Sequence, residues 1–171
     1  MLYLPIIASK TLSDRKFKKI EKTLRQSGRN NVLDVSNKHF MLLMEYKVEE
    51  FWAGPFSRPE FFNRNRLLYF IPTVRWAIDF SESVIEFGFL LSEVSSNGFD
   101  SSETQGFEAD ELTAMDLLKI AQEKKLVVEE IIFKKDDVFI KINFDGTIRV
   151  DLNEVTDVEN FFEKLAEKVR K

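Results

Sequence analysis

The sequence predicts an α+β fold, with a mainly antiparallel sheet of about seven strands and three helices. Asp145-Gly146, a dipeptide typical of tight hairpins, separates two segments in which apolar and polar residues alternate. Apolar residues recur at helical spacing in residues 13–27, 109–125 and 157–170. Strands and helices do not alternate regularly along the chain, so a doubly wound parallel sheet is not expected.

The chain begins with a predicted strand, Leu2–Ala8, followed by a helix over residues 13–27. Pro5 suggests an edge position for the strand, because proline has no N–H to donate to a sheet. Ser13 is a suitable N-cap for the helix, and Gly28 a suitable C-cap. The apolar stripe of the helix is expected to contain Phe17, Ile20 and Leu24.

Two hairpins are predicted to follow. Val32–Val35 pairs with His39–Val48, and Leu67–Phe80 pairs with Val84–Val94 across a turn at residues 81–83. Two successive hairpins imply an antiparallel sheet. In the predicted strand Leu67–Phe80, alternation places Val74, Trp76, Ile78 and Phe80 on one face.

Residues 95–107 are rich in Ser and Gly and poor in large apolar residues, which predicts a flexible loop. This loop divides the chain into a lobe of residues 1–94, with the order β-α-β-β-β-β, and a lobe of residues 108–171, with the order α-β-β-β-α. The second lobe alone would have a very small core. We therefore expect the two lobes to form one structural unit.

The composition, 44% hydrophobic and 32% charged in 171 residues, is that of a globular protein. No cysteine is present, which excludes disulfides, thiolate nucleophiles and cysteine-ligated metals. We find no catalytic, cofactor-binding or metal-binding motif and expect no cofactor. No segment is long and apolar enough to span a bilayer, and the N-terminus does not resemble a secretory signal. We expect a cytoplasmic protein that does not bind membranes.

Positive charge is concentrated near the N-terminus. The whole chain has a net charge of −4, but residues 1–30 contain 8 Lys and Arg against 2 Asp and Glu. Such asymmetry indicates a localised basic face, which could bind an acidic protein or a phosphate backbone. The simplest alternative is a solvated helix surface. The predicted basic face contains Arg15, Lys16, Lys18, Lys19, Lys22, Arg25 and Arg29.

Residues 51–66 combine aromatic side chains and arginines in an irregular segment broken by Gly54, Pro55 and Pro59. Aromatic residues and arginine are typical anchors of protein interfaces. They also suit single-stranded nucleic acid, whose bases stack on aromatic rings. The third possibility is that the rings simply pack in the core. The candidate partner-binding residues are Trp52, Phe56, Arg58, Phe61, Phe62, Arg64 and Arg66.

We therefore expect a non-enzymatic interaction module, an accessory or assembly subunit that docks a protein partner or another copy of itself. The alternative is a single-stranded nucleic-acid-binding protein that uses the same surfaces. A weaker alternative is an enzyme in which carboxylates such as Glu49-Glu50, Glu129-Glu130 and Asp136-Asp137 converge to bind Mg²⁺. His39, the one histidine, lacks a neighbouring nucleophile motif and is interpreted as structural.

Overall fold

A computed structural model of the chain describes residues 2–8, 13–26, 32–34, 40–45, 60, 63–64, 66–96, 113–151 and 156–169. The strands of these residues form one sheet in the order β2-β3-β1-β8-β7-β6-β5, and β4 also pairs with β1. Every pairing is antiparallel. The predicted α+β class and antiparallel sheet are therefore confirmed.

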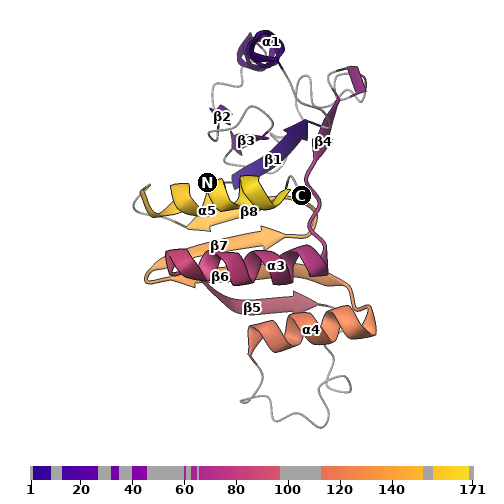
Figure 1. Cartoon of the computed structure of the whole chain (residues 1–171), viewed down its shortest axis with the longest axis vertical. Helices are drawn as coiled ribbons and strands as arrows, with labels where there is room; N and C mark the ends of the chain where they lie inside the picture. The colour runs from indigo at the N-terminus through magenta and orange to yellow at the C-terminus, as the bar shows by residue number, and fades with distance from the viewer. Residues whose placement is uncertain are drawn as a thin grey trace.

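The strands are β1 (Leu2–Ala8), β2 (Val32–Asp34), β3 (Phe40–Glu45), β4 (Leu67–Tyr69), β5 (Leu90–Ser96), β6 (Val128–Lys135), β7 (Val138–Asn143) and β8 (Ile148–Asp151). The helices are α1 (Asp14–Gln26), α3 (Val74–Val84), the 3₁₀ turn η3 (Ile85–Phe87), α4 (Ala114–Lys124) and α5 (Thr156–Val169). Figure 1 shows α5 and α3 in front of the sheet, α4 next to β5, and α1 at the other end of the molecule, beyond β2.

The first strand is not at an edge, contrary to the expectation from Pro5. β1 pairs with β3 along one side and with β8 and then β4 along the other. The Pro5 carbonyl accepts a hydrogen bond from the Phe70 amide, so the backbone of Pro5 faces the side of β8 and β4. On that side β8 pairs only with Leu2 and Tyr3, and β4 pairs only from Ile6 onward, so neither strand pairs with Pro5 itself. Proline is therefore tolerated there although it has no N–H to donate.

The prediction of one strand over Leu67–Phe80 is wrong. The strand ends at Tyr69, and α3 begins at Val74 after the N-cap Thr73, whose hydroxyl accepts a hydrogen bond from the Trp76 amide at 3.2 Å. The sequence is compatible with both structures, because buried Ala77, Phe80, Ser81 and Val84 also follow helical spacing. Burial of this stripe against the sheet selects the helix.

The predicted turn at residues 81–83 lies inside α3, where serine hydroxyls bond back to the helix backbone. The Ser81 hydroxyl donates to the Ala77 carbonyl at 2.6 Å, and the Ser83 hydroxyl donates to the Phe80 carbonyl at 2.7 Å. These bonds satisfy both hydroxyls, so a serine can be buried in the helix. The helix therefore continues through a segment whose composition is typical of a turn.

The predicted hairpin between Leu67–Phe80 and Val84–Val94 does not form. Residues 85–87 are the 3₁₀ turn η3, which ends at Gly88 with a φ of 83°. β5 starts only at Leu90 and pairs with β6, whereas β4 pairs with β1. The inference of an antiparallel sheet was correct, but this hairpin does not support it.

The second predicted helix starts later than residue 109, at Ala114. Thr113 and Asp116 form a capping box in which each side chain accepts a hydrogen bond from the other residue's backbone amide. The hydrogen bonds from Thr113 hold the pKa of Asp116 below its usual value. The remaining helices are close to their predicted bounds of 13–27 and 157–170.

The core between the helices α3 and α5 and the strands β5–β8 contains a cluster of contacting aromatic rings among aliphatic side chains. Phe80, Phe89, Phe133 and Phe161 are fully buried in it. Trp76 stacks on Phe80 with ring centroids 4.7 Å apart and an interplanar angle of 12°. Phe80 thus lies in the core and Trp76 packs against it, and the two lie one helical turn apart rather than on the predicted strand.

A second set of buried side chains lies outside the aromatic core. Tyr3 of β1 packs on Phe162 of α5, so its neighbours Leu2 and Leu4 point to the other face of the sheet. Members of this set are aliphatic except for Phe17. They are Leu2, Leu4, Ile6, Phe17, Ile20, Leu43 and Leu67.

The turn between β7 and β8 contains the predicted Asp145-Gly146 pair and lies close to the start of α3. Gly146 has a φ of 102°, and a Cβ atom there would lie 2.5 Å from the Phe70 carbonyl oxygen. Glycine is therefore required at this position, because its φ is positive and because there is no room for a Cβ atom. The division into lobes at residues 95–107 stays a prediction, because residues 97–112 lie outside the described ranges.

Candidate interaction surface

The helix α1 is amphipathic, as predicted. Ser13 caps it: its hydroxyl accepts a hydrogen bond from the Lys16 amide at 3.3 Å, and its carbonyl accepts one from the Phe17 amide at 2.9 Å. Phe17 and Ile20 are 6% and 2% exposed and form the buried stripe. The side chain of Leu24, the third predicted member, lies outside what the structure describes.

The basic face of α1 consists of Arg15, Lys16, Lys18, Lys19 and Lys22. All are exposed except Lys16, which is half-buried. No ion pair between described residues involves any of them. Because Lys18 and Lys22 are four residues apart, and Lys19 and Lys22 three, these like charges repel one another. The other predicted members, the Arg25 side chain and Arg29, lie outside the described part of the chain.

In the aromatic–arginine segment, residues 51–66, the structure describes only residues 60, 63, 64 and 66. Arg64 and Arg66 are exposed, and the Arg66 amide donates a hydrogen bond to the Asn63 carbonyl at 3.3 Å. Arg66 has a φ of 54°, a left-handed conformation that is uncommon outside glycine. The remaining candidates lie outside the described residues. They are Trp52, Phe56, Arg58, Phe61 and Phe62.

The register of the sheet brings the two predicted features to the same end of the molecule. Ala8, the last residue of β1, is paired with Leu67, the first residue of β4. β1 leads from this point toward α1, and Arg66 immediately precedes β4. Figure 1 shows α1 and the start of β4 at the same end of the structure. Arg64 and Arg66 can therefore extend the basic face of α1.

The net charge differs in sign between the first and second parts of the chain. Residues 1–79 contain 14 Lys and Arg against 8 Asp and Glu, whereas residues 80–171 contain 11 against 21. The chain is therefore positive in the part that holds α1 and β1–β4 and negative in the rest. An acidic partner that approaches the positive end is attracted at long range, and salt would weaken this attraction.

The carboxylates considered for Mg²⁺ do not converge within the described ranges. No group of three Asp, Glu or His side chains that could hold a metal ion is found there. Glu130 forms an ion pair with Lys141 at 3.6 Å, and Asp136-Asp137 forms the turn between β6 and β7. Glu49, Glu50 and His39 lie outside the described residues.

The structure also reveals acidic stripes on α3 and α5, which we did not predict. Exposed carboxylates follow helical spacing on both helices; this acidic face consists of Asp79, Glu82, Glu86, Glu159, Glu163 and Glu167. The four-residue spacing of the last three is readable in the sequence. The stripe on α3 was hidden because residues 74–80 resemble a strand.

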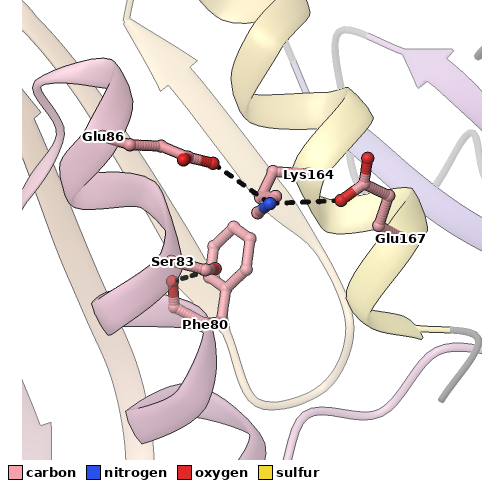
Figure 2. A network of polar contacts seen from close by, with 5 residues as sticks. All are labelled: Phe80, Ser83, Glu86, Lys164 and Glu167. Carbon is pink, nitrogen blue, oxygen red and sulfur yellow. Dashed lines mark hydrogen bonds and ion pairs between the residues drawn. The ribbon is translucent and has the colours of Figure 1, made fainter.

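Lys164 connects the two acidic stripes, as Figure 2 shows. Its ammonium group lies 3.0 Å from Glu86 Oε1 and 3.2 Å from Glu167 Oε2. The hydrogen bonds to Glu86 and Glu167 raise the pKa of Lys164. This contact places the turn η3, which follows α3, beside the second half of α5.

No known protein family, curated protein or solved structure matches this chain. Among the described residues, no helix has both the length and the apolar character needed to cross a membrane.

Proposed function

We propose that this chain is a non-enzymatic interaction module, an accessory or assembly subunit that docks an acidic protein partner. The basic face of α1 supplies charge complementarity, and the aromatic–arginine segment supplies anchoring side chains. We place this activity in the cytoplasm, since the cysteine-free chain needs no disulfide.

One observation carries the proposal: α1 presents a dense row of exposed cations without ion-pair partners among the described residues. Phe17 and Ile20 fix the helix to the sheet, so the cations need not move to meet a partner. An acidic surface would relieve the repulsion between neighbouring lysines. Such complementarity increases association rates and selects partners by charge.

A single-stranded nucleic acid is the second candidate partner, because phosphates would relieve the same repulsion. Base stacking requires accessible aromatic faces. Trp76 is unsuitable for stacking, since it packs between Phe70 and Phe80. The acidic face on α3 and α5 would also repel a nucleic acid that extends beyond α1. These points favour a protein partner.

A photo-cross-linking experiment can identify the chemical class of the partner. A photoreactive amino acid replaces Lys18 on α1 or, as a matched control, the exposed Lys119 on α4. After irradiation of cells that express the chain, we expect an adduct of defined mass at position 18 only. This adduct should be destroyed by protease and resist nuclease.

Either of two results would overturn the proposal. An adduct at position 18 that nuclease removes would establish the nucleic-acid alternative instead. Equal adducts at positions 18 and 119 would show that α1 has no special role in docking. A second variant, with Lys19 and Lys22 changed to Glu, should lose the specific adduct if charge is the determinant.

A further inference from the structure

The acidic face is complementary to α1 in charge and in form. Glu159, Glu163 and Glu167 recur every four residues on α5, so they line up along one exposed side of the helix. The cations of α1 lie along one side of a helix of similar length, 13 residues against 14. A row of carboxylates therefore exists that matches the row of ammonium groups.

The surface around α5 strengthens this match. Asp79 and Glu82 of α3 and Glu86 of the following turn η3 form an exposed stripe, and Lys164 joins Glu86 to Glu167 of α5 (Figure 2). The pairing with Lys164 uses only Glu86 and Glu167. Glu159 and Glu163 remain exposed, and no ion pair between described residues involves them.

The two complementary faces do not meet within one chain. α1 lies beyond β2 at one end of the sheet, whereas α3 and α5 cover the strands toward the other end (Figure 1). No ion pair between described residues joins the basic face to the acidic face. Contact between a basic face and an acidic face of this kind therefore requires a second molecule.

We propose that the partner docked by α1 is a second copy of this chain, which offers the acidic face of its α3 and α5. The inference rests on the proposed function and names the partner of the same basic surface. The interface is heterologous, because different patches of the two copies meet. Each copy keeps one unused face, so association continues until a ring closes or a filament grows.

A charge-swap experiment with purified protein tests this inference. One variant carries Lys19→Glu and Lys22→Glu, and a second carries Glu159→Lys and Glu163→Lys. Sedimentation of the wild type at low salt should show assembly that increases with concentration and dissociates in high salt. Each variant alone should weaken self-association by roughly tenfold or more, because both faces then have the same sign.

Mixing the two variants should restore assembly, with the variants alternating at 1:1 stoichiometry, and combining all four substitutions in one chain should also restore it. Loss of folding cannot produce this rescue. Matched controls reverse exposed charges elsewhere: Lys119→Glu with Arg149→Glu, and Glu93→Lys with Glu123→Lys. These controls should assemble like the wild type.

A wild type that stays monomeric from about 1 to about 500 μM at low salt would overturn the inference. Assembly that persists in both variants, or is not rescued by mixing, would also overturn it. The proposed function would survive either result if Lys18 still cross-links specifically to a different protein. It would fail separately if the Lys18 adduct is lost or is removed by nuclease.

Discussion

Among the described residues, the core between the helices α3 and α5 and the strands β5–β8 contains six buried phenylalanines, whereas the second set of buried side chains, around β1, contains one, Phe17. The largest fully buried side chains of the first region are Phe80, Phe89, Phe133 and Phe161, and those of the second are Leu4, Ile6 and Leu43. The first region is packed under three helices and carries an excess of acidic residues, whereas the second supports the basic helix α1. The first region therefore has the larger aromatic core, and the second holds the surface for which we propose a docking role.

Phe161 provides the strongest test of the aromatic region. Its ring contacts those of Phe80, Phe89 and Phe133 at centroid distances of 5.1, 5.1 and 5.4 Å. We expect Phe161→Ala to lower the free energy of unfolding by about 3–5 kcal/mol, through the lost contacts and the remaining cavity. Chemical denaturation measures this change.

The control for this experiment is Phe139→Ala on β7. Phe139 is 41% exposed, so its loss should cost less than about 1 kcal/mol. Similar losses for both variants would show that the aromatic core does not dominate the stability of the chain.

Substitutions of Trp76 separate the stabilisation provided by its ring from the cost of burying its Nε1–H group. Its Nε1–H is buried and has no hydrogen-bond partner in the described part of the chain. Trp76→Ala should cost about 3 kcal/mol. Trp76→Phe should cost less than about 1 kcal/mol, because it keeps a ring beside Phe80 and removes an unsatisfied donor. Denaturation curves that place the Phe variant at the level of the Ala variant would contradict this account.

Substitution of Lys164 is expected to have the smallest effect, and the matching substitution of Lys22 allows charged groups in the two regions to be compared. Lys164→Met removes two ion pairs and should lower the melting temperature slightly, by less than Trp76→Ala does. Lys22→Met on α1 should leave the melting temperature unchanged or raise it, because it reduces repulsion. A decrease for Lys22→Met equal to that for Lys164→Met would show that both lysines stabilise the monomer.

The effect of Lys164 also depends on pH. Because the pKa of Lys164 is raised in the folded state, its contribution is fully present below the unfolded pKa, roughly 10.4. The contribution is lost as the pH rises through the folded pKa. Melting curves of the wild type and Lys164→Met should therefore converge at strongly alkaline pH, and a constant difference would contradict the proposed ion pairs.

Much of the fold could be predicted because local patterns and burial agree. Residues 13–27 and 157–170 have a single apolar stripe at helical spacing, and Asp145-Gly146 specifies a turn. The α3 segment could not be assigned in this way, because Val74–Phe80 has an apolar stripe at both strand and helix spacing. The candidate site was predicted in part: the basic face of α1 is present, but the acidic face that complements it depends on α3 being a helix.

Composition and residue spacing within single segments are enough to specify the fold class, the amphipathic α1 and the basic charge of its exposed side. Three features become visible only in the folded chain: residues 74–84 are helical, β1 is an interior strand, and Lys164 of α5 pairs with Glu86 at the end of the α3–η3 segment. These features depend on contacts between distant segments: burial chooses between two periodicities, and strand pairing determines which neighbours Pro5 has. Local sequence carries no direct record of such contacts.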